Sequence, residues 1–115
     1  MRRGDIHLVG LEPARGGEAN KVRPAVIVSN DAANRSVELS GRGVVAVVPL
    51  TSNTSRILSF QAFLAAEESH LPQNSKVQCE QIRAVSPDRV LKRIGQVPRQ
   101  RMVEIDRALR RHLAL

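Results

Sequence analysis

Two short runs of β-branched residues constrain the fold of this chain more than any other feature of its sequence. PAVIVS (24–29) and VVAVVPL (44–50) are each long enough for one strand, and each is apolar on both alternating faces. Strands of this kind are buried on both sides, so we expect the two to be neighbours inside one sheet. We expect Pro49 to end the second strand, because proline lacks the N–H that a central strand needs.

Short strands separated by turns account for most of the remaining sequence. Residues 4–11 alternate between apolar and polar, which predicts a half-buried strand with Asp5 and His7 on its exposed face. Residues 60–66 favour a strand, with a helix as the alternative, and residues 76–85 favour one continuous strand. Turn-rich connecting segments are expected at residues 30–43, 51–59 and 68–75, a single helical turn at 86–90, and a last strand at 91–97.

An amphipathic helix is expected at the C-terminal end of the chain. After Pro98, the apolar residues Met102, Ile105, Leu109 and Leu113 recur at spacings of three and four, and arginines occupy the other faces. We expect this apolar stripe to cover the core. The pattern as a whole predicts one mainly β domain over residues 1–115, a small β-barrel with an appended helix.

The charge of the chain limits the kind of partner that it can bind. Its formal net charge is +7, and the basic residues are spread along the sequence, which favours an acidic partner such as nucleic acid or an acidic protein. Phe60 and Phe63 are its only aromatic residues, too few for a series of base-stacking platforms. Nucleic acid would therefore be bound through charge, hydrogen bonds and the shape of a groove.

The sequence predicts neither a cofactor nor a metal site. The histidines His7, His70 and His112 and the single cysteine Cys79 are isolated, with no pair at metal-ligand spacing, and His7 and His112 are expected at the surface. No glycine-rich phosphate loop precedes a helix. A single cysteine, no apolar stretch long enough for a membrane span and no apolar leader segment predict a cytoplasmic location without membrane association.

Two polar positions stand at the ends of the two buried runs. Arg23 immediately precedes Pro24, and Thr51 with Ser52 follows Leu50. If these ends meet at one rim of the sheet, a guanidinium and a hydroxyl would together suit a phosphodiester, because guanidinium binds two phosphate oxygens in a planar fork. The alternative, an exposed arginine and a threonine at a strand end, remains open at this point.

Three stretches of the chain resemble MazF/PemK-type toxins of toxin–antitoxin systems, in the order and at the spacing of that family. They are RRGDIHLVGLEPARGGEANKVRPAVIVSND (2–31), VVPLTSNT (47–54) and HLPQNSKVQCEQIRAVSPDRVLKRIGQV (70–97). The resemblance implies a small SH3-like β-barrel with a C-terminal helix, usually a homodimer. It also implies a metal-independent endoribonuclease that cuts single-stranded RNA and is neutralised by a cognate antitoxin with an acidic, flexible tail.

The resemblance also implies which residues do the chemistry. The family's catalytic arginine and threonine fall on Arg23 and Thr51, and the nucleophile is the RNA's own 2′-OH, so that DNA resists cleavage. Residues 15–22 would cover the RNA and read its bases, but Gly17 and Ala19 depart from the family's usual serine and glutamine. The RNA-binding residues that the resemblance suggests are Arg15, Gly17, Glu18, Asn20, Lys21, Ser52, Gln81 and Arg83, of which Gln81 and Arg83 equally suit a structural polar strand face.

Two alternatives belong to other functional classes. One is a toxin of the CcdB type, which binds a protein target such as gyrase and catalyses nothing. The other is an inactive basic module that binds RNA through charge alone, with the salt dependence typical of phosphate contacts.

Overall fold

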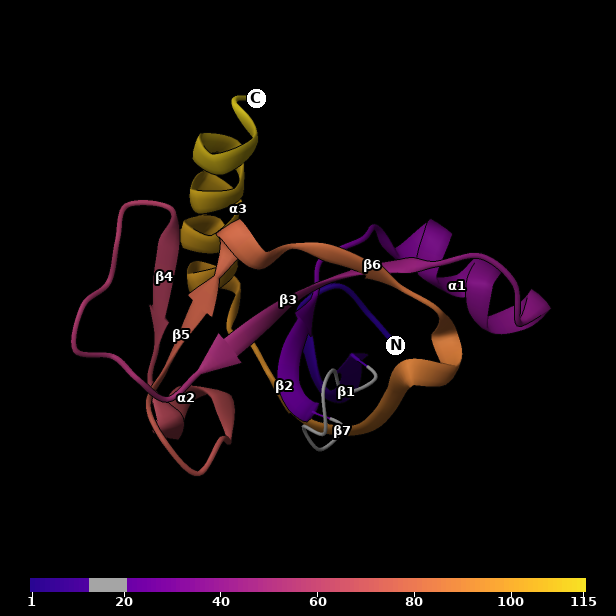
Figure 1. Cartoon of the computed structure of the whole chain (residues 1–115), viewed down its shortest axis with the longest axis horizontal. Helices are drawn as coiled ribbons and strands as arrows, with labels where there is room; N and C mark the ends of the chain where they lie inside the picture. Colours follow the sequence, from indigo (N-terminus) through magenta and orange to yellow (C-terminus); the bar gives the residue numbers. More distant parts are fainter. Residues whose placement is uncertain (13–20) are drawn as a thin grey trace.

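The structure is a computed structural model that describes residues 1–12 and 21–115. It contains a seven-stranded antiparallel sheet and three α-helices (Figure 1). The strands are β1 (Asp5–Glu12), β2 (Lys21–Ile27), β3 (Val45–Thr51), β4 (Gln61–Leu64), β5 (Ser75–Gln78), β6 (Arg83–Val85) and β7 (Val90–Gln96). The helices are α1 (Asp31–Ser40), α2 (Ala66–Ser69) and α3 (Arg99–Leu113), with single 3-10 turns η1 (Cys79–Gln81) and η2 (Pro87–Arg89).

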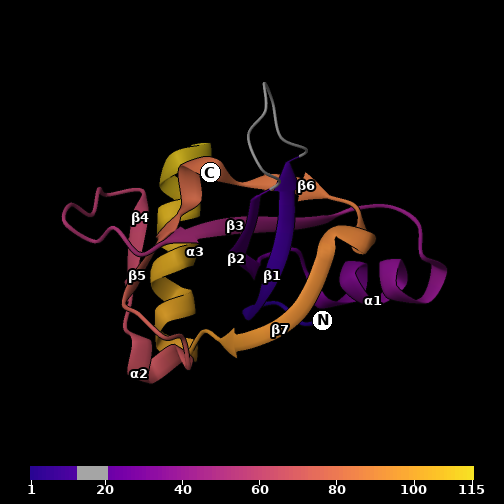
Figure 2. The ribbon, with the colours of Figure 1, turned by 60° about the horizontal axis from the view of Figure 1, so that its bottom comes forward.

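The sheet is organised around β3. Its strand order is β4-β5-β3-β2-β1-β7, and β6 pairs with β3 beside the start of that strand. Figure 2 shows β7 passing below β1 while β4 and β5 stand beside α3, so the sheet bends strongly without a described pairing between β4 and β7 to close it. The predicted architecture, mainly β with a C-terminal helix, is confirmed.

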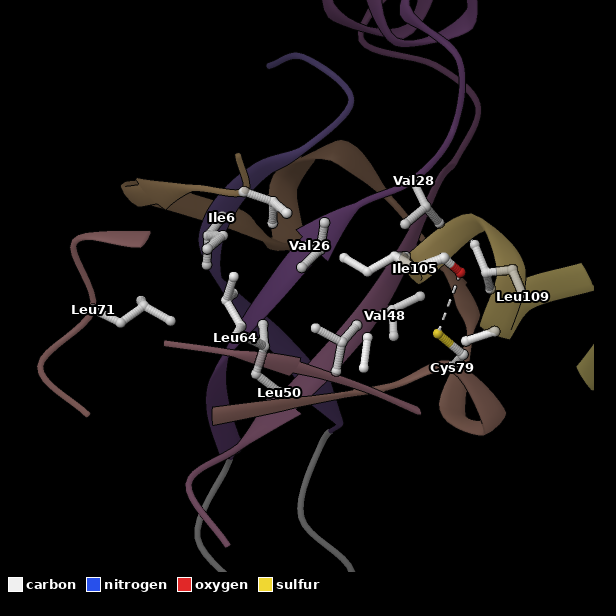
Figure 3. Packing of buried hydrophobic residues seen from close by; sticks show 14 residues of the cluster. Ile6, Val26, Val28, Val48, Leu50, Leu64, Leu71, Cys79, Ile105 and Leu109 are labelled. Carbon is white, nitrogen blue, oxygen red and sulfur yellow. Dashed lines mark hydrogen bonds between the residues drawn. The ribbon is translucent and has the colours of Figure 1, made fainter. Parts of the chain in front are cut away.

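The two apolar runs are buried on both faces, as their sequences predict. Val26 and Val48 belong to the main core beneath α3, where Figure 3 shows them beside Ile105. Ala25 and Val47 belong to a second core on the other side of the same strands. Alternate residues of β2 and β3 therefore support two separate cores, which fixes the register between the two strands.

Helix α3 covers the main core with the apolar stripe expected for it. Ile105 is fully buried, Leu109 is buried, and Met102 packs against the same cluster. Leu113, in contrast, is 45% exposed, so the buried part of the stripe ends one turn before the helix does.

Residues 30–43 form a helix rather than the expected turns. Asn30 caps α1, because its side chain accepts a hydrogen bond from Ala33 N at 2.8 Å, and Gly41 ends the helix in the left-handed conformation with φ of 69°. Val37 packs into the second core, and fully buried Asn34 donates to Ser29 O at 2.9 Å. Asn30 and Gly41, which suit turns, are thus the two caps of α1, and Asn34 is a hydrogen-bonding residue inside the helix.

Two predicted strand limits are also wrong. β3 continues past Pro49 to Thr51, because Pro49 lies between the stretch that pairs with β6 and the stretch that pairs with β5, where no ladder bond needs its N–H. Residues 76–85 are two strands instead of one. Val77 pairs with Leu50 of β3 and Arg83 pairs with Val47, and these two partners have two residues between them. Five residues lie between Val77 and Arg83, and the three extra residues form η1.

The first strand is buried on both faces, against the prediction. His7 is only 9% exposed, and its Nδ1 donates to Leu91 O at 2.9 Å on the neighbouring strand β7. Asp5 is buried as well, 3.3 Å from Arg93 Nε and accepting from Arg2 N. Each of the two polar side chains contacts a residue of β7, so polarity does not mark an exposed face here.

Two of the short remaining elements agree with the sequence in type, since residues 61–64 form a strand and η2 supplies the single turn after Ser86. The one-turn helix α2 was not predicted, and it occupies the end of the expected strand and the start of the expected connector. No helix in the described part of the chain has the length and apolar character needed to cross a membrane.

Candidate functional site

The register of β2 and β3 brings Arg23 and Thr51 together. The strands pair Ile27 with Val47 and Ala25 with Pro49. Continuing this register by two residues places Arg23 opposite Thr51, and side chains opposite each other on an antiparallel pair project from the same face. Both residues line one surface pocket of about 330 Å³. Its other lining residues are Pro24, Leu50, Ser52, Leu71, Pro72, Gln73 and Ser75.

Each member of the pair is held by its local structure. Arg23 is exposed, and β1 pairs with it through Val9, so its backbone is fixed inside the sheet while its side chain faces solvent. Thr51 is half-buried at the end of β3, where its Oγ1 accepts from Asn53 N at 3.3 Å as the chain turns away. Within the described residues the Arg23 guanidinium has neither a hydrogen bond nor an ion pair, so its charge is available to an anion.

The opposite wall of the pocket comes from the segment before β5 and the first residue of that strand, a stretch that the sequence predicts only as a connector. Leu71, Pro72, Gln73 and Ser75 lie there, because β5 pairs with the end of β3 and Lys76 is opposite Thr51. The sequence does mark this segment in one way, because the third stretch that resembles MazF/PemK-type toxins begins at His70.

The chemistry of the pocket suits an anion. Among the described residues that line it, Arg23 is the single charged one, and three hydroxyls and one amide accompany it over an apolar floor that includes Leu50 and Leu71. Among the described residues there is no cluster of three His, Cys, Asp or Glu side chains that could hold a metal ion. Cys79 is not among the described residues that line the pocket, and burial raises the pKa of its thiol to about 12.

The structure gathers some of the suggested RNA-binding residues and not others. Ser52 lines the pocket with Arg23 and Thr51. Gln81 lies in η1, and Arg83 pairs with Val47, four residues and roughly 13 Å along β3 from Thr51. Arg15, Gly17, Glu18 and Asn20 lie outside the described residues, as does the side chain of Lys21, the first residue of β2.

Comparison with known proteins gives a consistent result over the whole chain. A family model described as PemK-like, MazF-like toxin of type II toxin-antitoxin system matches residues 2–113. The chain is 49% identical over 115 residues to endoribonuclease MazF9 of Mycobacterium tuberculosis, covering 100% of this chain and 98% of that one. It is 31% identical over 109 residues to endoribonuclease MazF of Staphylococcus epidermidis, covering 95% and 88%.

One similar solved structure is an endoribonuclease in complex with its cognate antitoxin from a mycobacterial species. The TM-score is 0.76 at 25% identity, and the match covers 100% of this chain and 96% of that one. This agreement confirms the expected mainly β fold with a C-terminal helix, although the sheet in the described part of the chain is open and does not close into the expected barrel.

Proposed function

Because the chain belongs to the PemK-like, MazF-like toxin family of type II toxin–antitoxin systems, we propose that it is an endoribonuclease toxin whose cutting site is the pocket of Arg23 and Thr51. Its substrate is single-stranded RNA, cut within short sequences and without a metal ion. The observation that carries this proposal is the position of a guanidinium and a hydroxyl opposite each other at one rim of the sheet, in a pocket where none of the described lining residues is acidic.

Arg23 binds and neutralises the scissile phosphate. Its guanidinium donates two parallel hydrogen bonds to non-bridging oxygens and brings a positive charge next to them. The phosphorane that forms during cleavage carries more negative charge on these oxygens than the starting diester. Arg23 therefore stabilises the transition state more than the ground state, which is what accelerates a reaction.

The nucleophile is supplied by the RNA. The 2′-oxygen loses its proton and forms a bond to the adjacent phosphorus, while the bond from phosphorus to the 5′-oxygen of the next nucleotide breaks and that oxygen takes up a proton. The products are a 2′,3′-cyclic phosphate and a 5′-OH end. Because nucleophile and phosphorus belong to one molecule, the enzyme's task is to orient them, and Thr51 serves by donating to a phosphate oxygen or relaying a proton.

The remaining family-derived roles surround this centre. Ser52 contacts the RNA inside the pocket, while Gln81 and Arg83 contact it farther along the groove. The segment between β1 and β2 covers the RNA and reads its bases through Arg15, Gly17, Glu18, Asn20 and Lys21. Its two departures from the family, Gly17 and Ala19, give the chain its own sequence preference.

The partners follow from the same site. The cognate antitoxin places an acidic, flexible tail in the pocket, where its carboxylates compete with phosphate for Arg23.

The toxin is a homodimer, which is supported by the large apolar side chains that the protomer leaves exposed, among them Leu39 at 77% and Leu115 at 86%. It acts in the cytoplasm, where its RNA substrate is found.

The proposal is tested by incubating the purified protein with a long single-stranded RNA in excess chelator. Cleavage at a small number of sequences is expected, with DNA of the same sequence left intact. Binding without cleavage of any RNA would instead indicate the inactive module, provided that the logarithm of the binding constant falls linearly with the logarithm of the salt concentration. Inhibition of gyrase with RNA intact would indicate a toxin of the CcdB type.

A further inference from the structure

We propose that Gln73 is a specificity-determining residue that reads the base next to the phosphate bound by Arg23 and Thr51. This inference rests on the proposed function and deepens it. Gln73 lines the same pocket as Arg23 and Thr51, and its side chain is exposed to an incoming ligand.

The order of the strands sets Gln73 and Arg23 on opposite sides of Thr51. β3 lies between β2 and β5, and Thr51 is opposite Lys76 of β5, three residues after Gln73. Neighbouring strands are ~4.8 Å apart, so the two walls of the pocket are roughly 10 Å from each other. A phosphate held by Arg23 and Thr51 occupies one side, and an adjoining nucleoside extends to the other.

The chemistry of that second side fits a base better than a phosphate. Leu71 and Pro72 contribute apolar surface that can contact the face of a base, and none of the lining residues from this segment is charged. The Gln73 amide carries donors and an acceptor in one plane, and such an amide forms paired hydrogen bonds with a base edge. A phosphate site would favour Arg or Lys at this position.

The segment that carries Gln73 is rigidly held, while its amide is free. Asn74 Oδ1 accepts from Ala66 N at 2.9 Å, and Ser75 Oγ donates to Gln73 O at 3.3 Å. Buried Leu71 anchors the segment in the main core. No hydrogen bond of the Gln73 amide occurs within residues 1–12 and 21–115. The fixed backbone limits the ordering cost of binding to the side chain itself, and the unpaired amide is available to a base edge.

The experiment measures kcat/KM on short RNAs in which each base flanking the cut is replaced in turn by the other three. Gln73→Ala is expected to weaken discrimination at one position by about fivefold to a hundredfold and to leave the other positions unchanged. Gln73→Glu is expected to shift the preference at that position away from uracil and toward bases with an amino donor, because a carboxylate only accepts and uracil carries no amino group. Gln100→Ala, on an exposed position of α3, is the matched control and is expected to behave as wild type.

An unchanged preference at every position in Gln73→Ala, or a loss that is equal for all sequences, would overturn the role of Gln73 and leave the proposed function intact. If the wild-type protein cleaves none of the RNAs, the proposed function fails instead. In that case, the role of Gln73 is tested by binding. The affinities of wild type and Gln73→Ala are compared for the same RNAs, each with a 2′-deoxy nucleotide at one position in turn. Equal base preference in wild type and Gln73→Ala would then contradict the inference.

Discussion

Arg23 and Thr51 lie opposite each other on the neighbouring strands β2 and β3, in the register that Ala25 and Pro49 set two residues deeper in the sheet. The residues below them belong to closely packed cores, so the two head groups are positioned by strands that cannot slip. Substitutions that change one head group and keep its shape therefore test the chemistry separately from the fold.

Thr51 provides the first such test. Thr51→Val keeps the shape of the side chain and removes the hydroxyl, so kcat is expected to fall about ten- to a hundredfold, the range of one hydrogen bond to a charged group. Thr51→Ser keeps the hydroxyl and is expected to retain most of the activity. Single-turnover cleavage of one RNA by the three proteins makes the comparison, and equal rates for the Val and wild-type proteins would exclude a role for the hydroxyl.

The packing of α3 predicts a large difference between two positions of the same helix. Ile105 is fully buried beneath β4 and η1, so Ile105→Ala is expected to lower the free energy of unfolding by about 2–5 kcal/mol. Val103 is 47% exposed, and Val103→Ala is expected to change it by no more than about 0.5 kcal/mol. Urea unfolding followed by circular dichroism measures both, and similar losses would contradict this packing.

Glu68 links α2 to α3 and gives stability a defined dependence on pH. Its carboxylate accepts from Ala65 N at 2.8 Å and from Arg101 Nε at 3.0 Å, and these contacts, the backbone one foremost, lower its pKa below the ordinary 4.5. A lowered folded-state pKa stabilises the protein fully above about pH 4.5 and less as the pH falls through the lowered value.

Glu68→Gln is therefore expected to be less stable than wild type at neutral pH, with a difference that shrinks on acidification below the ordinary pKa of Glu68. Thermal unfolding of both proteins over a pH series measures this. A difference that stays constant down to the acid unfolding of wild type would show that the ionised carboxylate contributes nothing.

Cys79 is expected to be unreactive in the folded protein. The thiol is fully buried, and Figure 3 shows it directed at Ile105 of α3, whose carbonyl oxygen is 3.9 Å from Sγ. Burial is the main cause that raises its pKa to about 12, and the nearby carboxylates of Glu80 and Asp106 add to it. The reactive thiolate at pH 8 is reduced roughly a thousandfold relative to a free thiol.

Alkylation by iodoacetamide at pH 8 should accordingly be very slow for the native protein and fast in guanidinium. Rapid labelling without denaturant would show that α3 does not cover Cys79 as described here.

The parts of the fold that follow from the sequence are those with strong periodicity. These are the apolar runs at 24–29 and 44–50, which suit only buried strands, and the apolar stripe through Ile105, which suits only an amphipathic helix. Residues 30–43 were misread because Asn30 and Gly41 favour turns as readily as helix caps, and only burial of Val37 selects the helix. The burial of His7 did not follow from the sequence, because its partner is a backbone carbonyl on β7, a neighbouring strand that is 84 residues away in the sequence.

The site was predictable to a similar degree. Arg23 and Thr51 could be found because each adjoins a recognisable strand, and matching strand ends were the one assumption required. Gln73 could not be found, because its place in the pocket depends on β5 pairing with the last residues of β3. Pairings between strands that are distant in sequence leave no periodic signal within either segment.

The most direct test of the account is an end-group analysis of RNA cleaved in excess chelator by wild type, Arg23→Ala and the control Arg35→Ala, which changes an exposed arginine of α1. We expect wild type and Arg35→Ala to produce 2′,3′-cyclic phosphate and 5′-OH ends at equal rates, and Arg23→Ala to be slower by about a hundredfold to a thousandfold. Full activity of Arg23→Ala, or products that carry a 5′-phosphate, would contradict the central claim that Arg23 stabilises an intramolecular transesterification.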